Sequence, residues 1–270
     1  GEGIELARKY GVRAFPTMFL LDVEGKPIYK ILGAQDARVF LDKVKRGLGL
    51  KYGYAEAKQK YEAGERSVAL MADYYLVMQD AGELKSSNNV FDYLATLNET
   101  QRYSQDAWKL YDGFINDYNS SEFKFLVENR QKFIKEIEGK VVDKKMEEVL
   151  FPVVVEYLRG ERTKENMNTV QELIKIGKFQ PDYSLTLLSE IISYYDNQEF
   201  EKLLDFYETK IMGVNDVLTR LNLDLLLKNL LKQASQKQKE RALVYVKKCA
   251  EKADAKSKNS YDSLVQVLTE

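Results

Sequence analysis

The feature that most constrains the fold is one short strand-like segment, followed by an almost unbroken series of helical patterns. Residues 18–21 form the apolar run Met-Phe-Leu-Leu, which is typical of a strand covered on both faces. Asp22–Gly25 supplies a turn, and residues 26–32 predict a second strand. A short helix that stops at Gly11 precedes this hairpin, and a helix over about residues 36–46 follows it. The sequence therefore predicts a single β-hairpin between two helices.

From about residue 53 onward no strand is predicted, and about a dozen amphipathic helices follow. Their connections are short, so sequence neighbours should be antiparallel and form stacked helical hairpins. Pro152 lies within one strongly periodic segment and predicts a kink or a break there. The predicted fold class is α+β and mostly α, with residues 1–50 as one domain and 51–270 as a helical, repeat-like domain. The helices are expected near 66–81, 104–118, 143–158, 164–177, 182–196, 198–212, 214–234, 238–254 and 258–269.

A faint internal echo is consistent with helical repeats. The pattern Tyr118…Glu122-Phe123…Leu126 recurs as Tyr195…Glu199-Phe200…Leu203. The offset between the two copies would suit two helix pairs of roughly tetratricopeptide size, about 34 residues each or slightly more. Coincidence among helices rich in Tyr and Glu is left open as the alternative.

The composition removes most catalytic chemistry. The chain has no histidine and a single cysteine, Cys249, which excludes imidazole-assisted nucleophiles, imidazole metal ligands and an intrachain disulfide. No pair stands out among the 42 acidic residues, so no catalytic residue, metal site or cofactor is predicted. The net charge of −1 gives no global basic field for nucleic acid, and no apolar run reaches the roughly 20 residues of a membrane span.

The segment ELARKYGVRAFPTMFLLDVEGKPIYKILGAQDARVFLDKVKRGL, about residues 5–48, resembles the C-terminal half of a thioredoxin. The family shows a helix ending in Tyr-Gly-Val, a hydrophobic-Pro-Thr step, a hairpin with an acidic turn and glycine, a further glycine, and a final helix. All of these occur here in order. A thioredoxin-like domain followed by helices is similar to bacterial envelope proteins, which implies a periplasmic or envelope location if the resemblance holds; otherwise the compartment is unknown.

The resemblance implies roles for two residues. Pro16 matches the cis-proline of the family, and Phe15 before it matches the residue whose backbone pairs with a bound peptide in a strand-like contact. Taken without the family, Phe15 is expected in the core and Pro16 in a rigid turn. The half of the family fold that carries Cys-x-x-Cys has no counterpart here. Cys249 lies on an apolar helical face and is expected to serve packing.

The resemblance implies the C-terminal part of a thioredoxin-like thiol-disulfide oxidoreductase or isomerase, with a helical protein-interaction domain that holds polypeptide or protein partners and with no redox activity of its own. The alternative is a non-enzymatic helical adaptor or scaffold in which the thioredoxin remnant is structural. The first strand would lack a neighbour along one edge. We expect a truncated gene product as the origin and packing against the following helices as the source of stability. A homodimer through the open strand edge is the other option.

Overall fold

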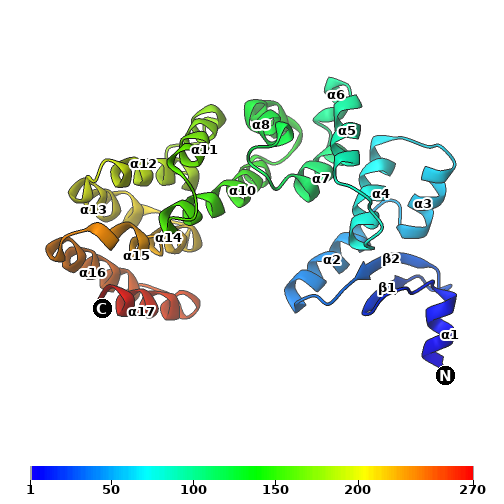
Figure 1. Cartoon of the computed structure of the whole chain (residues 1–270), viewed down its shortest axis with the longest axis horizontal. Helices are drawn as coiled ribbons and strands as arrows, with labels where there is room; N and C mark the ends of the chain where they lie inside the picture. The colour runs from blue at the N-terminus through cyan, green and yellow to red at the C-terminus, as the bar shows by residue number, and fades with distance from the viewer. Residues whose placement is uncertain (1, 270) are drawn as a thin grey trace. The chain divides into compact units, whose positions relative to one another are not determined.

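The computed structural model describes residues 2–269, and its fold is α+β and mostly α, as the sequence predicts (Figure 1). The chain divides into two compact units, residues up to 116 with 120–139, and residues 117–119 with 140 onward. The first unit contains α1 (Glu2–Lys9), β1 (Thr17–Leu21), β2 (Pro27–Leu32), α2 (Ala37–Gly49), α3 (Tyr54–Glu62), α4 (Val68–Asp80), α5 (Asn88–Thr96), α6 (Glu99–Arg102), α7 (Gln105–Phe114), α8 (Ser121–Glu128) and α9 (Arg130–Glu136).

The hairpin forms where the turn residues predict it. β1 and β2 pair antiparallel, with Met18 opposite Ile31 and Leu20 opposite Tyr29. In the turn, Oδ1 of Asp22 accepts hydrogen bonds from two backbone amides of residues 24 and 26, at 2.9 and 2.7 Å. Gly25 has a φ of 77°, which a glycine adopts without steric cost. The side chains of β1 and β2 alternate, so the four paired residues named above share one face of the sheet.

That face is buried against α2, which precedes residue 50, and against α3 and α4, which follow it. Tyr29 and Ile31 form a core with Leu70, Val77 and Met78 of α4, to which side chains of α2 and α3 add. The hairpin therefore shares one hydrophobic core with the first helices that follow it, as expected for its stability. The compact units do not divide at residue 50, and the domain boundary proposed there stays a prediction from sequence texture.

Buried polar side chains also link the hairpin to these helices. Tyr29 donates a hydrogen bond to Asp80 with 2.5 Å between the oxygens, and Lys43 and Arg46 of α2 pair with the same carboxylate at 3.0 and 3.4 Å. Glu83, just beyond α4, accepts from Lys30 of β2 and from the Tyr54 hydroxyl, both at 2.6 Å. Each carboxylate thus joins the hairpin to the helices around it.

The second unit is built of helices alone within residues 140–269. Its elements are α10 (Gly139–Arg159), which begins at the last residue of the first unit, α11 (Lys164–Gly177), α12 (Ser184–Asp196), α13 (Phe200–Thr209), η1 (Ile211–Gly213), α14 (Val217–Asp224), α15 (Leu227–Leu230), η2 (Leu231–Gln233), α16 (Gln236–Glu251) and α17 (Ala255–Thr269). No helix among the described residues has the length and apolarity needed to cross a membrane, in agreement with the prediction of no membrane span.

One helix expectation is wrong, and another is narrowed. The single helix expected over 214–234 is divided into α14, α15 and η2. At the division, the carbonyl of Leu223 accepts from the buried Tyr207 hydroxyl at 2.8 Å and from the Leu226 amide at 3.1 Å, the latter an i+3 bond in place of the i+4 bond of an α-helix. α10 continues on both sides of Pro152, so of the two outcomes expected there the break does not occur and the kink stays a prediction.

The apolar residues of α2 that recur at helical spacing are only partly covered. Phe40 and Val44 pack against the core, but Leu41 and Leu48 are 54% and 66% exposed. Ala37, at the start of the same periodic series, is exposed as well. The periodicity correctly indicated a helix, yet it did not show that part of its apolar face lacks a neighbour among the described residues.

Candidate functional site

The candidate site lies where α1 turns into β1. Gly11, with a φ of 61°, ends the helix, and the chain then runs through residues 12–16 in an extended loop. The Phe15–Pro16 bond is cis, as expected for Pro16. The carbonyl of Pro16 accepts a hydrogen bond from the Gly33 amide at 2.9 Å, and Thr17 donates its hydroxyl to the carbonyl of Ala14 at 2.6 Å. These bonds hold the loop against the end of β2.

Phe15 is the most unusual residue of the loop. Its side chain is 85% exposed, so the expectation that it lies in the core is wrong. Burying such a ring in a complex would contribute about 2 kcal/mol. Pro16 is also exposed, and Tyr10 packs instead against Phe19 of β1, with ring centroids 5.4 Å apart. The aromatic side chain that the loop leaves uncovered is therefore Phe15.

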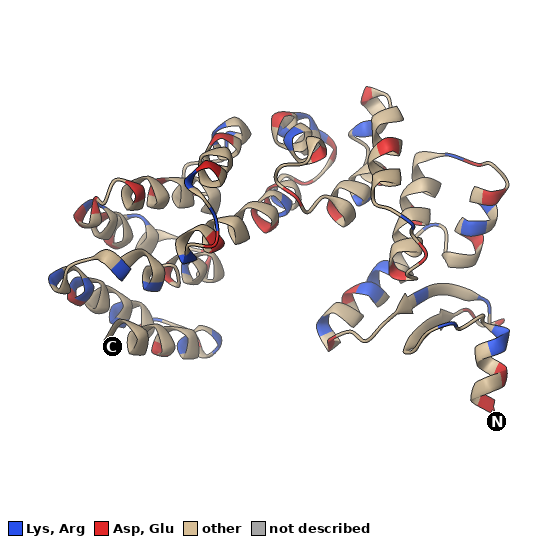
Figure 2. Ribbon diagram, in the orientation of Figure 1, with Lys and Arg blue, Asp and Glu red and all other residues tan. Residues whose placement is uncertain are grey.

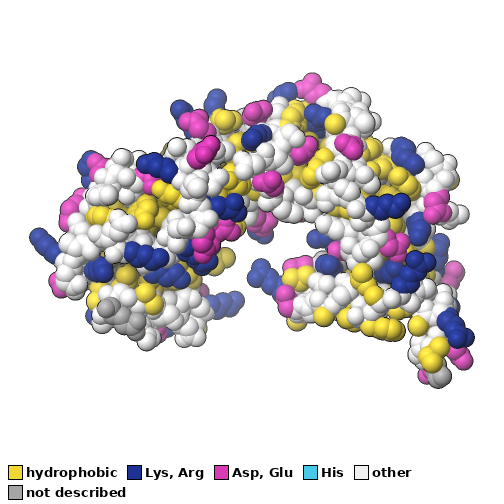
Figure 3. Space-filling view, in the orientation of Figure 1, with side chains coloured by type: hydrophobic (Ala, Val, Ile, Leu, Met, Phe, Trp, Pro, Cys, Tyr) yellow, Lys and Arg dark blue, Asp and Glu magenta, His cyan; other side chains and the backbone are white. Residues whose placement is uncertain are grey.

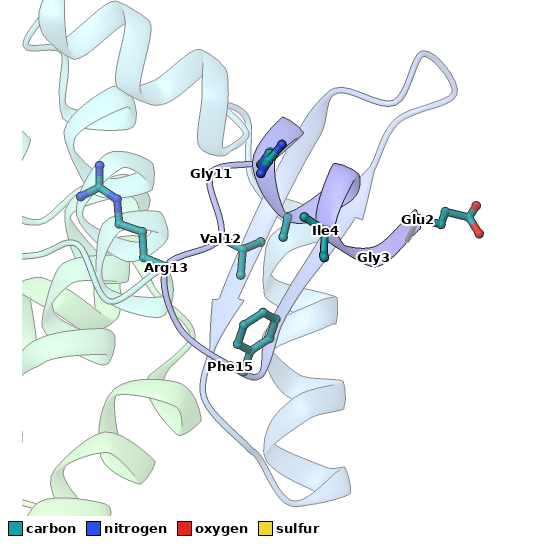
Figure 4. A pocket seen from close by; sticks show the side chains of 9 residues that line it. Glu2, Gly3, Ile4, Gly11, Val12, Arg13 and Phe15 are labelled. Carbon is teal, nitrogen blue, oxygen red and sulfur yellow. The ribbon is translucent and has the colours of Figure 1, made fainter.

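A groove of about 590 Å³ opens beside this ring (Figure 4). The side chains of Ile4, Val12 and Phe15 gather around it, whereas Arg13 points away from them. Its wall also includes Arg8, so positive charge borders an apolar surface. The lining is completed by Glu2, Gly3, Ala7 and Gly11.

The edges of the two strands differ. A Cβ added to Gly53 would lie 2.9 Å from the carbonyl oxygen of Ile28, so backbone lies directly against the outer side of β2. β1 has no second strand neighbour within residues 2–269. It also carries no charged residue, as Figure 2 shows, although charge is a common means of keeping an open edge unpaired. The edge of β1 is consequently free and unprotected.

Exposed apolar side chains are most numerous in the part of the chain that holds the hairpin and its flanking helices. Eight of the fourteen large hydrophobic residues exposed in the part of the chain that is described lie between Ile4 and Leu48. Figure 3 shows hydrophobic side chains gathered along the hairpin and its flanking helices. Scattered exposed hydrophobics are normal, but Ile4 and Phe15 gather at one groove, and a grouped apolar surface of this kind indicates an interaction site. The eight are Ile4, Leu6, Phe15, Leu21, Val23, Val39, Leu41 and Leu48.

No redox or metal chemistry is assembled at this site. Cys249 is far along the sequence in α16 and is 4% exposed. Burial, followed by the nearby charge of Asp224, raises the pKa of its thiol to about 11, so the thiol stays protonated near neutral pH. Its packing role is confirmed. Within residues 2–269 no three His, Cys, Asp or Glu side chains lie close enough to hold a metal.

The sequence named Phe15 and Pro16 but missed the rest of the groove. Ile4 and Ala7 lie in the short first helix, which the sequence predicted without a binding role. Nothing in the local pattern distinguishes an apolar face with a neighbour from one without. The chain matches no known family model, and neither a curated protein nor a solved structure shows significant similarity to it.

Proposed function

We propose that this chain is the polypeptide-binding, C-terminal part of a thioredoxin-like thiol-disulfide protein and carries out no thiol exchange itself. One observation carries the proposal: the uncharged free edge of β1 lies beside the exposed ring of Phe15, while the edge of β2 is covered. An extended polypeptide can add to such an edge through backbone hydrogen bonds. Its apolar side chains would then enter the groove between Ile4 and Phe15.

The order of elements in residues 2–49 supports the thioredoxin part of this proposal. Helix, hairpin and helix follow one another with Pro16 before the first strand and Gly33 after the second. The cysteine pair that performs dithiol exchange in that family has no equivalent in this sequence, which contains only Cys249. Exchange would therefore depend on residues outside this sequence.

A non-enzymatic adaptor is the second candidate, and a different observation favours it. The hairpin is joined to the helices by Asp80 and Glu83, as an integral structural layer would be. In that case the hairpin would serve the helices, and partners would bind elsewhere on them.

Binding of a permanently unfolded probe separates the two candidates. A carboxymethylated, fluorescently labelled polypeptide should bind the chain, as measured by anisotropy. Phe15→Asp should weaken this binding at least about tenfold, because it places a charge in an apolar contact. Val23→Asp is the matched control, since Val23 is fully exposed in the hairpin turn and does not line the groove. Both variants should melt like the unmodified chain.

If the two substitutions weakened polypeptide binding equally, or if neither weakened it, the groove would not be the binding surface. The non-enzymatic adaptor would then be the remaining candidate. In a parallel insulin-reduction assay with dithiothreitol, the chain should give the same rate as buffer. A faster rate would contradict the statement that it performs no exchange.

A further inference from the structure

A second pocket lies within the first unit and shares no residue with the groove beside Phe15. It has a volume of about 270 Å³ and is formed by α5, α6, α7 and α8. Its walls are mainly apolar and aromatic, and two opposite charges also line it. The lining residues are Phe91, Leu94, Ala95, Arg102, Tyr111, Ser121, Glu122 and Phe125.

Arg102 supplies the positive charge. Its guanidinium carbon lies 4.6 Å from the centroid of the Phe125 ring, and Nη2 donates to the carbonyl of Leu94 at 2.9 Å. That carbonyl lies near the end of α5, where helix carbonyls lack partners within the helix. Nε is buried without an acceptor, and Arg102 forms no ion pair with any residue from 2 to 269. A guanidinium has five donors, so most of its capacity to bind an anion is unused.

Glu122 supplies the negative charge at the start of α8. One carboxylate oxygen accepts from the hydroxyl of Ser121 at 2.9 Å, and no cation pairs with Glu122 among the described residues. Arg102 and Glu122 do not neutralise each other by an ion pair. The pocket therefore presents one site for an anionic group and another for a cationic group.

Tyr111 contributes a hydroxyl group to the same pocket. Its side chain is 2% exposed, and its hydroxyl forms no hydrogen bond within the described part of the chain. Burial raises the pKa of Tyr111, while Arg102 lowers it and Glu122 raises it by their charges, so both charges act on this hydroxyl. The phenol remains protonated near neutral pH and can donate to a bound anion.

We propose that this pocket binds a free α-amino acid with an apolar side chain. Arg102 and the Tyr111 hydroxyl receive the carboxylate, Glu122 receives the ammonium group, and the side chain packs against the rings of Phe91 and Phe125. The volume fits one residue-sized ligand and is below the range of about 300–1,000 Å³ of drug-sized pockets. Glu122 disfavours a dianion such as phosphate, because it adds repulsion beside Arg102.

Calorimetric titration of the whole chain with L-leucine and L-phenylalanine tests this inference without any substitution. Both should bind. L-leucinamide, which lacks the carboxylate, and N-acetyl-L-leucine, which lacks the ammonium group, should each bind at least about tenfold more weakly, as expected for the loss of a charge-assisted hydrogen bond. No heat with either amino acid, or equal affinity for the blocked forms, would overturn the proposal.

Variants then assign the two ends of the ligand. Glu122→Gln should weaken L-leucine at least about tenfold and leave N-acetyl-L-leucine unchanged, because the neutral amide no longer attracts an ammonium group. Lys124→Gln is the matched control on α8, since it is exposed and outside the pocket. Arg102→Gln should abolish the preference for L-leucine over L-leucinamide. The assigned roles would be wrong if Glu122→Gln still preferred L-leucine over N-acetyl-L-leucine as the unmodified chain does. They would also be wrong if Arg102→Gln kept the preference for L-leucine over L-leucinamide.

Discussion

Tyr29 and Asp80 are 51 positions apart in the sequence, yet the phenol of Tyr29 donates directly to the buried carboxylate of Asp80. Tyr29 is fully buried and Asp80 is 5% exposed. Asp80 also pairs with Lys43 and Arg46, so a single carboxylate receives groups from β2 and α2 at the end of α4. This bond is a direct polar link between the hairpin and the helices.

Tyr29→Phe should lower the free energy of unfolding by about 1–2 kcal/mol. It removes one hydrogen bond to a charged group but keeps the buried ring, and Lys43 and Arg46 still compensate Asp80. Urea unfolding measures the change. Tyr52→Phe is the control, because the Tyr52 hydroxyl makes no hydrogen bond within residues 2–269, and it should unfold like the unmodified chain. Identical stability of both variants would show that the bond contributes nothing.

Gly47→Ala should destabilise the chain although alanine usually favours a helix. A Cβ on Gly47 would lie 2.5 Å from the Tyr29 ring, and relieving that overlap should cost about 1–3 kcal/mol. Gly49, in the same helix, has no atom within 4 Å of its Cβ position. Gly49→Ala should therefore be neutral or stabilise by up to about 1 kcal/mol. Thermal melting of both variants checks whether the two changes differ in sign or size as expected.

Asp224 should make the second unit less stable as pH rises from about 4 to 6. Its carboxylate accepts hydrogen bonds from Tyr245 and Tyr261, both at 2.7 Å, but burial outweighs them and raises the pKa of Asp224 to about 6. Between the ordinary pKa of 3.8 and this value the folded chain holds an extra proton. Below pH 4 this extra proton contributes up to about 3 kcal/mol to the free energy of unfolding. That contribution is lost as the pH rises through 6.

Asp224→Asn isolates this contribution from all other titrating groups. The stability of the variant relative to the unmodified chain should increase with pH between 4 and 7, because the neutral amide does not ionise. Urea unfolding at several pH values measures the difference. Asp182→Asn replaces an exposed aspartate of the same unit and should give a nearly constant difference. A pH-independent difference for Asp224→Asn would contradict the prediction.

Local patterns were sufficient for the hairpin and for most helices. Gly11, Gly25 and Gly33 all have positive φ. They lie before β1, between the two strands and after β2, so they mark the ends of both strands. Within the helix expected over 104–118, the periodic apolar residues are all buried, although α7 ends at Phe114; they are Trp108, Tyr111, Phe114, Ile115 and Tyr118. Periodicity therefore identified burial more reliably than it identified the end of a helix.

What the sequence did not reveal depends on partners distant in the chain. The hydrogen bond from Tyr207 to Leu223 and the core contact of Tyr29 with α4 both join separate elements. The exposure of Phe15 follows from the lack of a neighbour, which no local pattern encodes. Arg102 and Glu122 come from different helices, and only their shared pocket relates them.

The common core of the hairpin and α4 limits how this chain can be shortened. A fragment ending at Leu50 would keep both strands but would expose Tyr29 and Ile31 to water and leave Lys43 and Arg46 without Asp80. A fragment starting at Lys51 would lack the hairpin and would therefore expose Val77 and Met78 to water. Neither half is a sound unit for expression, whereas a boundary after Gly139 keeps this core whole.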